Sequence, residues 1–132
     1  MAQRIEDVSH LDWRELKDVL EAADRTAVVI DVREPEEYEE AHIEGLPLIP
    51  MGDIIDWTET LDPEREYIFV CRSGRRSFEV AKYFQNNGFG HVHNFQGGML
   101  SWIGEGNDVA KGSAAPIESF ELPLTKKGDN EL

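Results

Sequence analysis

YIFVCRSGRRSFEVAKYF, residues 67–84, is the stretch of sequence that decides the fold. Its first four residues, 67–70, form an apolar run typical of a short buried strand, and residues 77–84 begin a helical pattern. Cys71, the one cysteine of the chain, opens the segment between them. A strand that turns sharply into a helix directs its turn amides and the partial positive charge of the helix N-terminus at one point. We therefore predict that the Cys71 thiol occupies a reactive, anion-binding position and ionises readily.

Strand and helix patterns alternate on both sides of this stretch. The predicted strands cover residues 4–8, 27–30 and 91–95, in addition to residues 67–70. The predicted helices cover residues 13–23, 36–41, 53–61 and 77–87, with a last helical turn at 99–103. Residues 45–50, GLPLIP, are too rich in proline for a central strand. This order predicts an α/β fold with an open, mainly parallel sheet of about five short strands and helices on both faces.

Residues that cap helices mark several of these boundaries. Asp12 is expected to be the N-cap of the first helix, with Glu15 as its reciprocal partner. Ser77 is expected to cap the helix that follows the cysteine loop. Gly88 should end that helix in the left-handed conformation.

The chain length suits one compact domain with a modest core. We place this domain at residues 1–105. Residues 106–132 are rich in Gly, Ser, Ala and Pro, and we expect a poorly ordered extension in which Phe120–Leu122 docks on the body or on a partner.

Composition excludes several classes of function. A net charge of −14 argues against binding to nucleic acid and to anionic membrane surfaces. No segment approaches the roughly 20 apolar residues of a membrane span, and residues 1–10 lack the apolar stretch of a signal peptide. A single cysteine excludes an internal disulfide, a C-x-x-C pair and a multi-cysteine zinc site, so we expect a cytoplasmic protein without a metal or cofactor.

The loop after the cysteine reverses the local charge of this acidic chain. Arg72, Arg75 and Arg76 fall within five positions of Cys71. Such a cluster attracts a small anion that the rest of the surface repels. The alternative is a solvated surface cluster, in which Arg72 is the arginine expected to point away from the site.

The ordered set of motifs resembles a single-domain rhodanese, a sulfurtransferase-like domain. The resemblance rests on Ile30-Asp31-Val32-Arg33, on Glu36-Glu37-Tyr38 with His42-Ile43, on the loop that Cys71 opens, and on Gly97-Gly98-Met99 followed by Trp102. It covers roughly residues 10–105. Ala41 stands where the family often has glycine and Glu44 where it often has proline, which puts only local geometry in doubt.

The resemblance implies that Cys71 accepts a sulfane sulfur from thiosulfate or a persulfide donor and passes it to a thiol or cyanide. The substrate-binding residues are then those of the loop: Arg72, Ser73, Gly74, Arg75, Arg76 and Ser77. Asp31, Arg33 and His42 are expected to support the site structurally, through an ion pair of Arg33 with Glu37 or another early carboxylate and through a hydrogen-bonded histidine. The acceptor must come from outside the chain, because there is no second cysteine. The oligomeric state stays open.

Two other readings of the same residues remain. A sulfur carrier or partner-binding module shares the fold, and the carrier shares the persulfide. A phosphatase or arsenate reductase is disfavoured because related folds place an arginine six residues after the cysteine, where this chain has Ser77. The blandest interpretation makes Cys71 a small buried hydrophobic residue.

Overall fold

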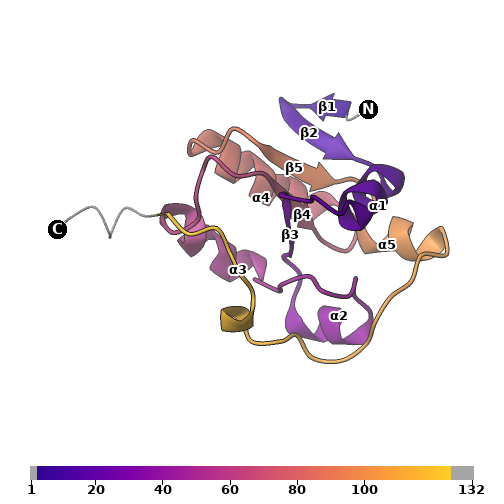
Figure 1. Cartoon of the computed structure of the whole chain (residues 1–132). Helices are drawn as coiled ribbons and strands as arrows, with labels where there is room; N and C mark the ends of the chain where they lie inside the picture. The colour runs from indigo at the N-terminus through magenta and orange to yellow at the C-terminus, as the bar shows by residue number, and fades with distance from the viewer. Residues whose placement is uncertain (1–2, 126–132) are drawn as a thin grey trace.

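The computed structural model describes residues 3–125 and contains one five-stranded sheet in the order β1-β2-β5-β4-β3 (Figure 1). β1 is antiparallel to β2, and the other neighbouring strands are parallel. The strands are β1 (Gln3–Ile5), β2 (Val8–Leu11), β3 (Val28–Asp31), β4 (Tyr67–Val70) and β5 (Val92–Phe95). The predicted open, mainly parallel sheet is confirmed.

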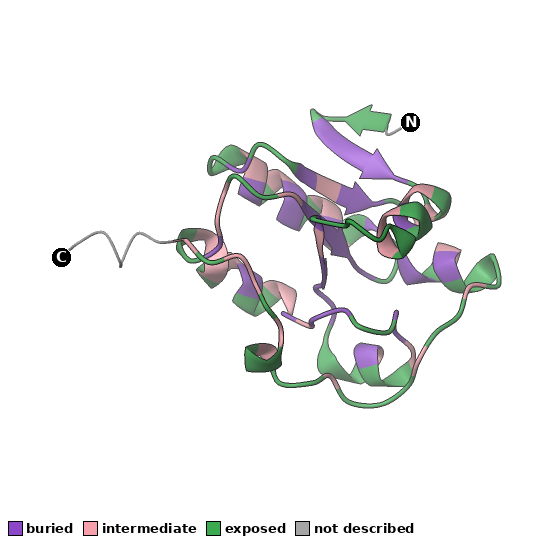
Figure 2. Cartoon of the chain, viewed as in Figure 1, coloured by how far each residue is buried: buried purple, intermediate pink, exposed green. Residues whose placement is uncertain are grey.

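Helices cover both faces of this sheet and bury two separate apolar clusters (Figure 2). The helical segments are α1 (Trp13–Glu21), α2 (Pro35–Glu40), α3 (Met51–Ile54), the 3₁₀ segment η1 (Ile55–Glu59), α4 (Arg75–Asn86), α5 (Gly98–Gly104) and η2 (Ile117–Ser119). Side chains alternate between the faces of a strand, so Phe69 packs with the α4 side, whereas Ile68 and Val70 pack with α1 and α5. Burial on both faces explains why residues 67–70 are apolar without interruption.

The N-terminal hairpin differs from the predicted single strand over residues 4–8. Glu6 and Asp7 adopt positive φ angles of 51° and 66° and turn the chain, so β2 follows and pairs in parallel with β5. β2 was missed because its two middle residues, Ser9 and His10, are polar although both are buried.

The N-cap predicted for α1 is present in the structure, and the N-cap predicted for α4 is not. The Asp12–Glu15 capping box is confirmed, with Glu15 N–H donating to Asp12 Oδ1 at 2.8 Å and Asp12 N–H donating to Glu15 Oε1 at 3.0 Å. The expectation that Ser77 caps the helix after the cysteine is wrong. That helix begins two residues earlier, at Arg75, because Gly74 takes the N-cap position with a φ of +95°. Ser77 is therefore an interior, buried residue of α4.

Residues 106–125 run along the body from α5 past α2 and α3 (Figure 1). Ala110 forms an isolated bridge with His42, and Leu124 forms one with Leu61. Ile117 and Leu122 pack against the cluster beneath α4. The proposed domain boundary at residue 105 stays a prediction, and the part of the extension over 126–132 lies outside the described residues. Among residues 3–125, no helix has the length and apolar character to cross a membrane.

Candidate active site

Cys71 is the first residue after β4, and its sulfur contacts two groups of the loop and of α4. Gly74 N–H donates to Cys71 Sγ at 3.1 Å, and Ser77 Oγ lies 3.2 Å from the same sulfur. The side chain is fully buried, with zero exposure. A loop amide therefore approaches the sulfur, as predicted, but in this conformation the sulfur is closed to solvent, which agrees with the alternative of a small buried residue.

The start of α5 holds the first half of the loop in place. Met99 N–H donates to the Cys71 carbonyl and Leu100 N–H donates to the Arg72 carbonyl, both at 2.9 Å. A Cβ at Gly98 would lie 2.5 Å from both of those carbonyl oxygens, so only glycine permits this approach. The Gly-Gly turn that the sequence places before residue 99 thus shapes the loop that carries the cysteine.

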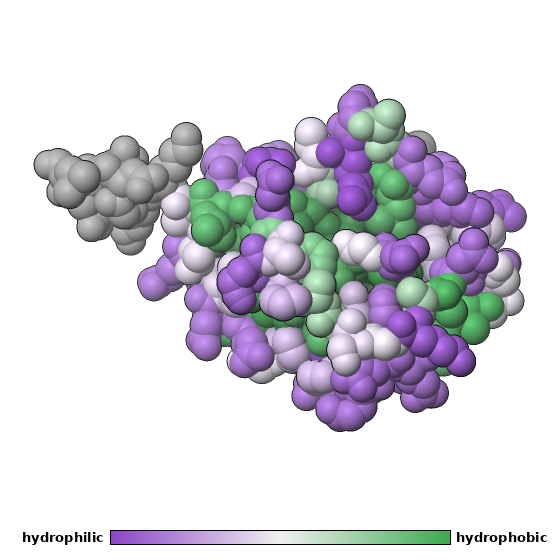
Figure 3. Space-filling model, turned by 60° about the horizontal axis from the view of Figure 1, so that its bottom comes forward, coloured by the Kyte–Doolittle hydropathy of each residue, from purple (hydrophilic) through white to green (hydrophobic). Residues whose placement is uncertain are grey.

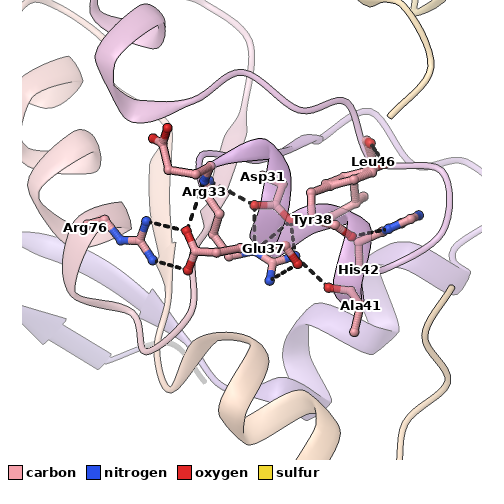
Figure 4. Close-up of polar contacts among 9 residues, drawn as sticks. Asp31, Arg33, Glu37, Tyr38, Ala41, His42, Leu46 and Arg76 are labelled. Carbon is pink, nitrogen blue, oxygen red and sulfur yellow. Dashed lines mark hydrogen bonds and ion pairs between the residues drawn. The ribbon is translucent and has the colours of Figure 1, made fainter. Parts of the chain in front are cut away.

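Arg76 binds Glu37 and is held by it (Figure 4). Its two terminal nitrogens donate to the two carboxylate oxygens of Glu37 at 2.8 and 2.7 Å. This paired hydrogen bond lowers the pKa of Glu37 from 4.5 to about 2 and raises the pKa of Arg76. Arg72 and Arg75 are instead exposed, as is Ser73. The three loop arginines therefore differ: one is paired, and two face solvent.

The Asp31–Arg33 pair lies buried at the end of β3 and fastens α2 (Figure 4). Arg33 Nε and Nη2 donate to the Asp31 carboxylate at 2.9 to 3.2 Å. Arg33 also donates to the backbone carbonyls of Glu37 and Ala41, at 3.2 and 2.8 Å. The ion-pair partner of Arg33 is thus Asp31, the early carboxylate, and Glu37 contributes its carbonyl.

His42 lies at the end of α2 with its ring stacked on Tyr38 at 3.8 Å (Figure 4). Its Nδ1 is 2.7 Å from the Tyr38 carbonyl oxygen, and Tyr38 O–H donates to the Leu46 carbonyl at 2.7 Å. Burial raises the pKa of Tyr38. These contacts make His42 part of the packing of α2, and its supporting role stays a prediction.

Two contacts at the site were not predicted from the sequence. Glu37 was expected as one candidate partner of Arg33, and its carboxylate instead binds Arg76, 39 residues away. Asn94, buried in β5, donates through Nδ2 to the Gly74 carbonyl at 3.0 Å and contacts Ser77 Oγ through Oδ1. The available signal, which the sequence analysis did not use, was a polar residue between the apolar residues of a short strand.

A pocket of about 220 Å³ opens beside the loop, between α2 and α5. Its walls include Arg72, Glu37 and the apolar residues Leu100 and Ile103, the last two being 51% and 48% exposed. Figure 3 shows an apolar surface patch over α5. The surface beside the loop therefore combines the exposed Arg72 guanidinium with an apolar wall.

Comparison with known proteins identifies the family. Residues 12–105 match the family model described as the rhodanese-like domain, so the chain belongs to that family and the predicted resemblance is confirmed. The protein named "Putative sulfurtransferase YtwF" of Bacillus subtilis is 46% identical over 75% of this chain and 94% of its own length.

Other relatives agree in family and fold. The thiosulfate sulfurtransferase GlpE of Coxiella burnetii is 32% identical over 72% of this chain and 84% of that protein. The crystal structure of a rhodanese-like domain protein from Staphylococcus aureus superposes with a TM-score of 0.66 at 32% identity, covering 79% of this chain and 98% of that one.

Proposed function

We propose that this protein is a sulfurtransferase in which Cys71 carries a sulfane sulfur as a persulfide. The observation that carries the proposal is the position of Cys71 directly after a central parallel strand, with the Gly74 N–H donating to its sulfur. Ligands of open α/β sheets bind at the carboxyl ends of the strands. The names of the YtwF and GlpE relatives support the same activity.

The proposed reaction has two balanced steps. The Cys71 thiolate attacks the outer sulfur of thiosulfate, the new S–S bond forms, and sulfite leaves with the electron pair of the old one. The persulfide anion then loses its outer sulfur to a thiolate or cyanide, which regenerates the Cys71 thiolate. N–H donors beside the sulfur stabilise the negative charge at each stage. The acceptor comes from outside the chain, which has one cysteine.

The three loop arginines have different roles in the proposed reaction. We assign recruitment of a small anionic donor to Arg72 and Arg75, which are exposed, with Ser73 and the Gly74 amide as further loop contacts. Arg76 is neutralised by Glu37, so its role is to anchor the start of α4 to α2.

Kinetics with thiosulfate test this division. Arg72→Gln and Arg75→Gln should each raise the KM for thiosulfate several-fold, with a smaller effect on kcat. The reason is that a loop with one positive charge fewer attracts the thiosulfate dianion less strongly. Arg65→Gln is the matched control, since Arg65 precedes β4 whereas Cys71 follows it. Equal changes in KM in all three variants would refute the assignment.

Access to the buried sulfur requires the loop to move. The backbone of Cys71 and Arg72 is held by α5, and the Gly74 carbonyl is held by Asn94. We therefore assign the movement to Ser73 and the side chains around it, with the Gly74 N–H kept on the sulfur. Alkylation of Cys71 by iodoacetamide should then be far slower in the native protein than in urea. Equal rates would show that the sulfur is open without any movement.

A sulfur carrier is the second candidate function. Because Cys71 is completely buried, its sulfur must be uncovered before reaction, and the binding free energy of a docked protein can drive that movement where a small anion supplies much less. The protein named "Putative sulfur carrier protein YrkF" of Bacillus subtilis is 40% identical over 63% of this chain, and the match spans 45% of that protein. Slow turnover with thiosulfate, combined with rapid sulfur exchange with a protein persulfide, would select the carrier.

Phosphatase chemistry stays disfavoured for this protein. The residue six positions after Cys71 is the buried Ser77, and Arg76, the residue before it, is bound to Glu37. A lone thiol that must stay reduced between turnovers also suits a reducing compartment such as the cytoplasm.

A further inference from the structure

A buried chain of polar groups connects Cys71 with β5 and β2. Ser77 Oγ lies 3.2 Å from Cys71 Sγ and 2.5 Å from Asn94 Oδ1. Asn94 Nδ2 lies 3.0 Å from the Gly74 carbonyl oxygen and 3.2 Å from His10 Nδ1. Ser77 and Asn94 are at most 2% exposed, and His10 is 4% exposed. Direct bonds within this chain therefore decide where its hydrogens lie, because water has little access.

The orientation of the Asn94 amide follows from the Gly74 carbonyl. A carbonyl oxygen only accepts hydrogen bonds, so the NH₂ group of Asn94 must face it. His10 Nδ1 then accepts the second hydrogen of the same group. Asn94 Oδ1 must consequently face Ser77. This assignment rests on the hydrogen-bond network, as amide orientations generally do.

The Ser77 hydroxyl has one hydrogen for two neighbours. Asn94 Oδ1 and Ser77 Oγ are two oxygens only 2.5 Å apart, and Oδ1 cannot donate, so the hydroxyl hydrogen must lie between them. Ser77 Oγ is then left to present a lone pair to the sulfur. The 3.2 Å contact between Cys71 and Ser77 becomes an S–H donor bonded to a hydroxyl oxygen.

We propose that Asn94 is a positioning residue. It accepts the hydroxyl hydrogen of Ser77, so that Ser77 can only accept a hydrogen from the sulfur, and in this way it holds Cys71 in the resting protein as a neutral thiol. This departs from the expectation, drawn from the sequence, of a thiol that is already ionised. As long as Asn94 accepts this hydrogen, Ser77 does not donate it to the sulfur. The inference rests on the proposed function only in treating Cys71 as the reactive residue.

Charged groups around the sulfur stay constant in the test described below. Arg76 on α4 interacts electrostatically with Cys71 and is bound to Glu37. Asp31 and Arg33, at the end of β3, bind each other. Burial lowers the pKa of His10, at the far end of the chain of polar groups, which favours its neutral form. Neutral variants of Ser77 and Asn94 therefore leave the surrounding charges unchanged, and the double variant described below separates the Ser77 hydrogen from the lost bond between Asn94 and the Gly74 carbonyl.

The test measures the thiolate fraction by its ultraviolet absorbance as a function of pH, with circular dichroism to verify folding. Asn94→Leu leaves the Ser77 hydroxyl hydrogen free to bond the sulfur. The thiolate fraction at neutral pH should then rise about tenfold, because one hydrogen bond to the charged sulfur corresponds to a change of about that size in the ionisation equilibrium. Ser77→Ala removes only an acceptor and should not lower the thiolate fraction.

The double variant shows whether Asn94 acts through Ser77. In a Ser77→Ala background, Asn94→Leu should no longer raise the thiolate fraction. Two results would overturn the proposal: a lower thiolate fraction in Ser77→Ala, which would mean that Ser77 already donates to the sulfur, or an unchanged fraction in Asn94→Leu. Absorbance reports ionisation without sulfur transfer, so failure of the sulfurtransferase proposal would appear separately, as absence of a persulfide.

Discussion

Replacing Glu37 by Gln removes one charge and keeps the shape of the side chain. The glutamine can still accept from the Glu34 N–H, as the Glu37 carboxylate does at 3.0 Å, so the start of α2 is preserved. A fall in the Glu37 pKa from 4.5 to about 2 corresponds to about 3.4 kcal/mol at 1.36 kcal/mol per pK unit. The side chains of Arg76 and Glu37 are 34% and 28% exposed, and solvent screening reduces this to about 1–2 kcal/mol.

The loss of stability in Glu37→Gln should depend on pH in a defined direction. The pKa of Glu37 is depressed in the folded protein, so its contribution is complete above pH 4.5 and is lost as pH falls from 4.5 through about 2. Urea unfolding, followed by tryptophan fluorescence, should therefore show a deficit of about 1–2 kcal/mol at pH 7. The deficit should shrink steadily as the buffer is taken below pH 4.5.

Glu36→Gln is the control for this experiment, because Glu36 is an exposed residue of the same short helix. It should change the unfolding free energy by no more than about 0.5 kcal/mol. A deficit in Glu37→Gln that is the same at pH 3 and pH 7, or one matched by Glu36→Gln, would refute the argument that the pair with Arg76 stabilises the folded protein.

Three other perturbations have expected outcomes. Gly98→Ala places a methyl group against the Cys71 and Arg72 carbonyls at a positive φ, and it should lower the free energy of unfolding in urea by about 2–4 kcal/mol. Gly104→Ala, at the other end of α5, should lower it by almost nothing, and equal effects would disprove the close approach. Asp31→Asn leaves the buried Arg33 guanidinium uncompensated and should cost about 3–5 kcal/mol, seen as a lower thermal midpoint; a change below about 1 kcal/mol would show that the pair is dispensable. Truncation after residue 105 should remove about 1–3 kcal/mol of apolar packing, and an unchanged unfolding curve would instead support the domain boundary predicted there.

Local sequence signals were enough to predict the centre of the fold. The apolar run 67–70, the cysteine and the helical pattern after it lie next to one another in the chain, and propensity and periodicity act over that distance. The capping box at the start of α1 was predictable for the same reason. The one error in this stretch was the N-cap of α4. Gly74, not Ser77, occupies the N-cap position, because its left-handed backbone lets the helix begin at Arg75.

Contacts between distant residues were not predictable from one sequence. Glu37 meets Arg76 across 39 positions, and Ser77 meets Asn94 across 17, so neither pair leaves a local pattern. The burial of Cys71 also depends on the packing of its side chain in the apolar cluster on the α4 side of the sheet, which no local pattern predicts. The sequence therefore predicted which residue carries the chemistry, which stays a prediction, and the structure was needed to show how that residue is held and covered.

Intact mass spectrometry of the native protein after incubation with thiosulfate tests the central claim most directly. The account predicts a gain of one sulfur atom, located on Cys71, removed by dithiothreitol and absent from Cys71→Ser. An unmodified mass in the wild-type protein with both thiosulfate and a protein persulfide as donor, or an equal gain in Cys71→Ser, would contradict the account.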